Sequence, residues 1–222
     1  MNAEPSALQL AALAACWLAY GALHSALAAF AVKRHVAARW PQLMPAYRLV
    51  FNLLAVLLLV PPVWLSFALR GEALWAWHGA LGWLADALAL AAVGGFLWSL
   101  RYYDLGRFGG LVQWKTRDAA VADGERFTLS PLHRWVRHPW YALALVMIWT
   151  RDMDAASLVS ALCVSLYFWW GSMLEERKLL AMHGTAYARY RQRVNALLPL
   201  PGRILDADEA HALCALEHPR RE

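Results

Sequence analysis

Two apolar segments, residues 140–150 and 155–173, carry charged or hydrogen-bonding residues at the ends that a tight turn would bring together. An Arg-His-Pro triplet, residues 137–139, precedes the first segment, and the acidic pair Glu175 and Glu176 follows the second. Carboxylates accept strong hydrogen bonds from ammonium groups, and a helix N-terminus attracts anions. These residue types are therefore typical of a pocket for a zwitterionic ligand.

A structural role explains the same residues equally well at this stage. Glu175 and Glu176 could do no more than pair with Arg137 or Lys178. Pro139 suits the first turn of a helix in either case, because its missing N–H would have no partner there. Both interpretations, a ligand pocket and a set of ion pairs, stay open on the residues alone.

The composition places these segments in a membrane. The chain has 222 residues, is 60% hydrophobic and has a mean hydropathy of +0.36, which is too apolar for an ordinary soluble domain. Thirteen tryptophans fit a membrane–water interface. Three widely spaced cysteines predict neither a disulfide framework nor a metal cluster. The pI of about 9.3 arises from basic flanks of the apolar segments, so no nucleic-acid partner is expected.

Four elements must position the charged residues. Residues 8–32, 47–69 and 77–100 are each long enough to span the roughly 30 Å of hydrocarbon as a helix. Residues 139–176 form a lopsided helical hairpin whose first arm is too short to cross. We predict an all-α integral membrane fold with about five transmembrane helices, the last two forming this hairpin, and with a ligand pocket at its cytosolic mouth.

Basic residues set the predicted orientation. The loop 101–138 carries seven lysines and arginines, Arg126 among them, whereas the loops on the opposite side offer only Arg70 and Arg151. Positive charge marks the cytoplasmic side. We therefore expect an external N-terminus and a cytoplasmic C-terminus in a bacterial inner membrane. The expected domains are a membrane domain over residues 1–201 and a short polar cytoplasmic tail over 202–222.

Polar side chains also occur inside the predicted spans. His24 lies one helical turn after Tyr20, and Asn52 one turn after Arg48. Ionisable residues within membrane helices are functional candidates by default. An interhelical hydrogen bond explains His24 as well, and Arg48 can simply extend its charge to the interface.

Two sequence stretches resemble a known superfamily. RHPWY at 137–141, then EERKLLAMHGTAYARYRQRV at 175–194 and a following LLP, resemble the signature of the isoprenylcysteine carboxyl methyltransferase and phospholipid methyltransferase superfamily. The order and spacing agree over residues 134–201. Shorter stretches, LHSALA, YRLVFNLLA and YYDLGRFGGLVQW, resemble its NnrU-like and methanethiol S-methyltransferase-like branch. His183 departs from the signature, because an aromatic residue is usual before that glycine.

The resemblance implies a membrane enzyme that uses S-adenosyl-L-methionine, and hence a cofactor pocket at the hairpin mouth. It implies that one glutamate of the acidic pair meets the ammonium group or ribose of the cofactor. Tyr187 shares a helix face with Tyr190, so it either contacts the cofactor or packs. The expected cofactor-binding residues are His138, Pro139, Tyr141, Glu175, Glu176 and Tyr187. The expected catalytic residues are His24, Asn52 and Arg137.

The expected reaction is methyl transfer to a small or lipophilic acceptor that enters from the bilayer. A thiol is favoured, because a histidine with an ordinary pKa of about 6.5, such as His24, can accept its proton. A prenylcysteine carboxylate or an amino-lipid stays open, as does the oligomeric state. The alternative is a non-enzymatic NnrU-like factor that binds a tetrapyrrole or assists assembly of a respiratory or denitrification complex. Its histidines, however, lack ligand spacing: neither HxH nor CxxC occurs.

Overall fold

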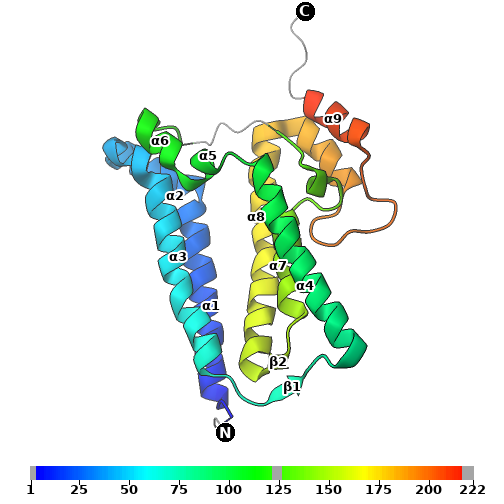
Figure 1. The fold of residues 1–222 in the computed structure, drawn as a ribbon. Coiled ribbons are helices and arrows are strands. Elements are labelled where there is room, and N and C mark those ends of the chain that lie inside the picture. The colour runs from blue at the N-terminus through cyan, green and yellow to red at the C-terminus, as the bar shows by residue number, and fades with distance from the viewer. Residues whose placement is uncertain (1–3, 122–126, 217–222) are drawn as a thin grey trace, which may run out of the picture. The chain divides into compact units, whose positions relative to one another are not determined.

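A computed structural model describes residues 4–121 and 127–216, which are almost entirely helical (Figure 1). Arg126 of the predicted cytoplasmic loop and residues 217–222 of the predicted tail lie outside the described residues. The chain divides into two compact units, which are described separately. The first unit comprises residues 1–78, 103–124 and 151–164, and the second comprises 79–102, 125–150 and 165–222.

Four helices are long and apolar enough to cross a membrane, which indicates an integral membrane protein. They are α1 (Ala7–Ala28), α3 (Met44–Ala68), α4 (Gly79–Ser99) and α8 (Ala155–Arg193). The all-helical class is therefore confirmed, and the long helices correspond to the predicted spans except that the first ends at Ala28 and not at residue 32. The short hairpin arm is α7 (Pro139–Trp149), whose eleven residues extend only about 16 Å at ~1.5 Å per residue. The count of five spans stays a prediction, because α7 is too short to cross by itself.

In the first unit, α1 and α3 pack side by side. The hydroxyl of Tyr47 donates to the carbonyl oxygen of Leu27 at 2.6 Å. At the other end of the pair, Trp17 Nε1 donates to Ser160 Oγ at 3.0 Å, and Ser66 Oγ lies 2.7 Å from the same oxygen. These bonds join α1, α3 and the first turns of α8. They pair the polar groups of Trp17, Ser66 and Ser160 with one another in an apolar environment.

Short helices follow the long ones in this unit: α2 (Phe30–Arg39), η1 (Pro41–Leu43), α5 (Leu105–Gly109) and α6 (Leu111–Thr116). Gly110, between α5 and α6, has a φ of +91° and lies so close to α3 that a Cβ atom would be 2.7 Å from the backbone nitrogen of Leu49. Both features require glycine at this position. The stretch GRFGGLVQW thus fixes a loop against α3.

Two very short strands, β1 (Ala73–Trp75) and β2 (Met153–Asp154), pair antiparallel in the first unit. They were not predicted from the sequence. They join the connection after α3 to the turn before α8, and Asp154 then caps α8 by accepting from the backbone N–H of Ser157 at 2.7 Å. The acids of the RDMD turn therefore have a local structural use.

In the second unit, α4 packs along α7. A stripe of buried alanines, Ala85, Ala89 and Ala92, runs along α4. Trp140 Nε1 donates to the buried Ser99 Oγ at 2.8 Å. The hairpin itself is held by Trp149 Nε1, which donates to Ser165 Oγ in α8 at 3.0 Å. Small residues allow this close approach of membrane helices.

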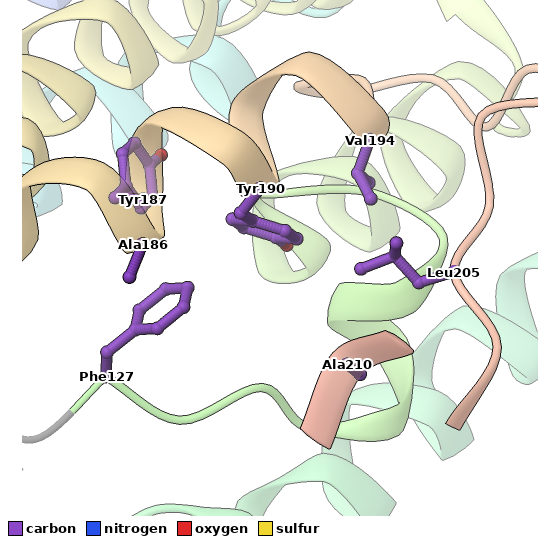
Figure 2. Close-up of a cluster of buried hydrophobic side chains, with 7 residues drawn as sticks. All are labelled: Phe127, Ala186, Tyr187, Tyr190, Val194, Leu205 and Ala210. Atoms are coloured by element: carbon purple, nitrogen blue, oxygen red, sulfur yellow. The ribbon is translucent and has the colours of Figure 1, made fainter. Parts of the chain in front are cut away.

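A buried hydrophobic cluster in the second unit is formed by residues outside the hairpin 139–176 (Figure 2). Tyr187, Tyr190 and Val194 from the end of α8 pack with Leu205 and with α9 (Ala207–Ala215). The predicted polar tail therefore contributes buried residues to this core, because it contains an apolar helix face as well as its acids. A membrane domain that ends at residue 201 stays a prediction.

Candidate functional site

The segment before α7 is fixed by backbone hydrogen bonds to the segment after α8. The N–H of Arg137 donates to the carbonyl oxygen of Asn195 at 2.8 Å, and the N–H of His138 donates to that of Ala196 at 3.0 Å. His138 is the N-cap of α7, and Pro139 occupies the first turn, as predicted. These bonds bring the Arg-His-Pro triplet to the acidic pair on α8.

The guanidinium group of Arg137 joins three parts of this site. Its Nε and Nη2 donate to Glu176 Oε1 at 2.8 and 2.6 Å. Its Nη1 donates to the carbonyl oxygens of Arg191, at 3.0 Å, and of Val194. Cations favour such unpaired carbonyls at a helix C-terminus. These contacts connect the start of α7 to the end of α8, and the predicted catalytic role of Arg137 stays a prediction.

The carboxylate group of Glu176 is buried and fully paired in the same set of contacts. Only 5% of the residue is exposed. Its second oxygen, Oε2, lies 3.2 Å from Arg191 Nε, and its Oε1 lies 3.3 Å from His138 Nε2 in addition to the bonds from Arg137. The carboxylate group is thus already surrounded by cationic partners.

Glu175 differs from its neighbour because 47% of its side chain is exposed. Its Oε2 accepts from the hydroxyl of Tyr141 at 3.1 Å and lies 3.4 Å from His138 Nδ1. Glu175 is therefore held in position while part of its carboxylate surface stays accessible. Of the two acids, it is the one whose geometry suits an incoming ammonium group.

His138 lies between the two carboxylates, with one ring nitrogen facing each. Burial by itself lowers the pKa of His138, but the hydrogen bonds and charges of Glu175 and Glu176 outweigh it and raise the pKa above its usual 6.5. The imidazolium form is therefore favoured near neutral pH. Since the pKa is raised, the ion pairs contribute most below pH 6.5 and are lost as the pH rises through the raised value.

A second, half-buried histidine has the opposite character. Burial, followed by the positive charge of His138, lowers the pKa of His133 to about 4, although Glu175 opposes this shift. Its Nδ1 is 2.8 Å from Ser130 Oγ and accepts the N–H of Ser130 at 3.3 Å. The neutral His133 therefore leaves the positive charge to His138.

Tyr141 uses its hydroxyl group at the site, and its ring is covered on both faces. The ring stacks on His138 with centroids 5.4 Å apart and on Phe168 with centroids 4.7 Å apart. The sequence favoured Tyr141 as a cofactor contact, with aromatic faces as candidate walls for the sulfonium. The hydroxyl group points to Glu175, and the role of Tyr141 as a cofactor contact stays a prediction.

Gly184 turns the last part of α8 toward this site. Its φ of 51° and ψ of −123° are not helical and interrupt α8 at this residue. Residues with a Cβ atom rarely adopt this conformation. After this bend the chain presents Tyr187 and Tyr190 to the buried cluster, with Phe127 against Tyr190 at a centroid distance of 5.8 Å (Figure 2).

Tyr187 shows an unmet hydrogen-bonding need. It is 2% exposed, and its hydroxyl oxygen is buried without a hydrogen-bond partner among residues 4–121 and 127–216. The guanidinium group of Arg137 approaches this phenol as a weak donor, outside the geometry of a full hydrogen bond, and Glu175 and Glu176 act on it electrostatically. A buried polar group without a partner is costly. This hydroxyl therefore fits a site that a polar ligand completes.

The two candidates from the predicted spans lie in the first unit. His24 is half-buried, and its ring is 5.0 Å from that of Phe51 and 5.7 Å from that of Tyr20. Asn52 Nδ2 donates to the carbonyl oxygens of Phe108 and Gly109 at 3.0 and 3.1 Å. Asn52 thus holds the C-terminal end of α5. The catalytic roles of Asn52 and His24 stay predictions.

Three residues that the sequence analysis did not select also shape the site: Phe168, Arg191 and His133. A signal for Phe168 existed, because it lies on one helix face with Ser172 and Glu175 at positions i, i+4 and i+7. Contacts of Arg191 and His133 depend on the bend at Gly184 and on the packing of α9, which no local pattern indicates.

Known proteins that are similar in sequence show the family of this chain. The chain is 32% identical over 196 residues to the methanethiol S-methyltransferase of Pseudomonas sp. strain GM41, covering 81% of this chain and 69% of that protein. It is 31% identical over 191 residues to methanethiol S-methyltransferase 2 of Bradyrhizobium diazoefficiens, covering 79% and 68%. The chain belongs to the methanethiol S-methyltransferase family.

Other comparisons are narrower. Methanethiol S-methyltransferase 1 of Bradyrhizobium diazoefficiens is 39% identical over 75 residues, which cover 33% of this chain and only 26% of that protein. No family model and no solved structure matches the chain. The family assignment therefore rests on the alignments that cover about four fifths of the chain.

Family membership confirms the resemblance to the membrane methyltransferase superfamily and the prediction of an enzyme. The relatives described above are named as S-methyltransferases, and none is named as a non-enzymatic assembly factor. A methyltransferase family implies S-adenosylmethionine as the methyl donor. The residues at the hairpin mouth fit this group, because they offer an accessible carboxylate, an imidazolium and the unsatisfied hydroxyl of Tyr187.

Proposed function

We propose that the protein is an integral membrane methyltransferase that transfers a methyl group from S-adenosylmethionine to a small lipophilic thiol. The observation that carries the cofactor site is the accessible carboxylate of Glu175, held by Tyr141 and His138. The unsatisfied hydroxyl of Tyr187 supports the same location. Family membership supports the reaction class.

Each residue at the hairpin mouth then has a proposed task. Glu175 accepts hydrogen bonds from the ammonium group of the cofactor, since charge-assisted bonds are the strongest available to it. The positive charge of His138 favours the cofactor carboxylate. Tyr187 supplies a donor from the buried side. Glu176 and Arg137 do not bind the cofactor in this proposal but hold the helix ends around it. The bound cofactor supplies a methyl group activated by a sulfonium.

The acceptor side needs a proton acceptor. In the proposed reaction the acceptor sulfur forms a bond to the methyl carbon while the bond from that carbon to the sulfonium sulfur breaks, and its electron pair stays on that sulfur. The thiol proton must leave before or during this step. We propose that His24 accepts it, since histidine is the side chain that most often serves as a general base.

A small thiol is the favoured acceptor because relatives over most of the chain are named for methanethiol. Prenylcysteine carboxylates and amino-lipids are the competing acceptors within the superfamily. The assay that distinguishes them uses purified protein with methyl-labelled S-adenosylmethionine and, in parallel, short alkanethiols, a prenylcysteine and phosphatidylethanolamine. We expect label in the thioether product of a short thiol. Label in phosphatidylethanolamine and in none of the thiols would contradict the proposal.

The proposal includes an orientation. The charge asymmetry predicts that the loop 101–138 and the C-terminus are cytosolic and that residues 151–154 face outward. Single cysteines at the exposed positions 115 and 151, in a background with the three native cysteines replaced, test this by labelling intact cells with an impermeant maleimide. We expect labelling at 151 alone, and labelling at 115 alone would reverse the orientation.

A further inference from the structure

The chain after the family signature ends is packed into the site region. We call residues 203–215 the C-terminal strap. Within it, Leu205 is 1% exposed and Ala210 is 6% exposed, and both belong to the cluster around Tyr190 and Val194 (Figure 2). Asp206 caps α9 by accepting from the N–H of Glu209 at 2.7 Å. The strap is therefore a folded part of the second unit.

Reciprocal hydrogen bonds join the strap to the segment that carries His138. The N–H of Leu205 donates to the carbonyl oxygen of Arg134 at 3.0 Å, and Arg134 Nε donates back to the carbonyl oxygen of Leu205 at 2.9 Å. The strap is also tied to the end of α8, because Arg193 Nη2 lies 2.5 Å from Glu209 Oε1.

The same segment is held from its other side by α8 and the residues after it. The hydroxyl of Tyr190 donates to the carbonyl oxygen of His133 at 2.7 Å. The backbone of Arg137 and His138 pairs with residues 195–196. Residues 131–138 are thus fixed between two segments, the strap on one side and the end of α8 on the other.

From this arrangement we infer that the C-terminal strap is a positioning element for the cofactor site, with Arg134 and Leu205 as its positioning residues. This inference rests on the proposed function. The strap has no proposed contact with the cofactor. It holds His138 next to Glu175. A site whose residues are already in position binds its ligand without the cost of ordering those residues first. Loosening the strap should therefore weaken cofactor binding more than turnover at saturating cofactor.

The test measures S-adenosylmethionine affinity by calorimetry and steady-state kinetics on Arg134→Ala and Leu205→Ala in the full chain. We expect the Kd for the cofactor to rise about 3- to 10-fold for Arg134→Ala, the effect of losing one hydrogen bond. The kcat at saturating cofactor should stay within about twofold, and the KM for the thiol should not change. Leu205→Met keeps the volume of the side chain, so its affinity for the cofactor should equal that of the wild type.

Arg189→Ala is the matched control. Arg189 is an exposed arginine in the last part of α8, close in sequence to Tyr190 and Arg193, which contact residues 131–138 and the strap. A lower melting temperature with an unchanged Kd in both alanine variants would show that the strap is only structural and would overturn the inference. If wild-type protein binds no S-adenosylmethionine, the proposed function is wrong and the positioning role falls with it. If the wild type binds and the strap variants bind equally well, only the positioning role is wrong.

Discussion

Polar residues in the two units are held in different ways. In the first unit, Asn52 bonds to backbone carbonyl oxygens, and His24 lies against aromatic rings. In the second unit, Arg137 and His138 both pair with the Glu176 carboxylate, and Arg137 also donates to two backbone carbonyl oxygens. A polar residue inside an apolar helix is therefore not a site by itself. Mutually paired charges with one accessible member, Glu175, are a stronger indication.

This contrast also limits what the ion pairs contribute to stability. Removing charges from water is costly, so a buried pair is weak support for a stability role, although breaking it is expensive. The connection from Arg137 to Glu176 is therefore better understood as fixing geometry. It brings the end of α8 and the start of α7 together around Glu175.

The largest expected effect concerns the first unit. His24→Ala should lower the methylation rate roughly 10²- to 10⁴-fold, the usual range for a general base, with cofactor affinity unchanged. Turnover and melting temperature should be measured on the same variant, with the exposed His35 changed to alanine as control. Full turnover in a stable His24→Ala protein would remove His24 from the mechanism.

The next effect breaks the paired charges of the second unit. Glu176→Gln should lower the free energy of unfolding by about 3–5 kcal/mol, because it leaves the buried Arg137 without its carboxylate. Denaturation in detergent measures this. Glu209→Gln is the control, since its ion pair with Arg193 is largely exposed and should matter by less than about 1 kcal/mol. Equal losses in both variants would erase the distinction between the two pairs.

A smaller effect sharpens the role of the bend in α8. Gly184→Ala should cost about 1–3 kcal/mol of stability, because alanine is strained at a φ of 51° even though open space surrounds the position. Gly171→Ala, also in α8 with open space but without a positive φ, should be neutral or stabilising by up to about 1 kcal/mol. Melting temperatures that fall equally for the two variants would show that the bend is not what requires glycine.

Much of the fold follows from the sequence because long apolar runs in a membrane leave the backbone no alternative to helices. Pro139 at the start of α7 was predictable because proline lacks the N–H that would be unpaired in the first turn. The hairpin then places the acidic pair opposite it. The β1–β2 pair was not predictable, since it depends on which turns meet. The burial of Leu205 was not predictable either, because it depends on the hydrogen bonds between Leu205 and Arg134 and on packing against Tyr190 and Val194.

The candidate site was predictable in its members and less so in their roles. The sequence selected both glutamates, but only the structure separates the buried Glu176 from the accessible Glu175, a difference created by where Arg137 reaches. Tyr141 was selected for a ring face that His138 and Phe168 cover. Such choices depend on three-dimensional neighbours, which one-dimensional spacing does not specify.

The accessible carboxylate of Glu175 is the centre of this account, and calorimetry of S-adenosylmethionine binding to the wild type and to Glu175→Gln tests it most directly. Loss of a charge-assisted hydrogen bond should cost about 1.5–3 kcal/mol, which is a rise in Kd of about 10- to 150-fold. The melting temperature should change little, because the side chain is half exposed. A Glu175→Gln protein that binds the cofactor as tightly as the wild type would contradict the account.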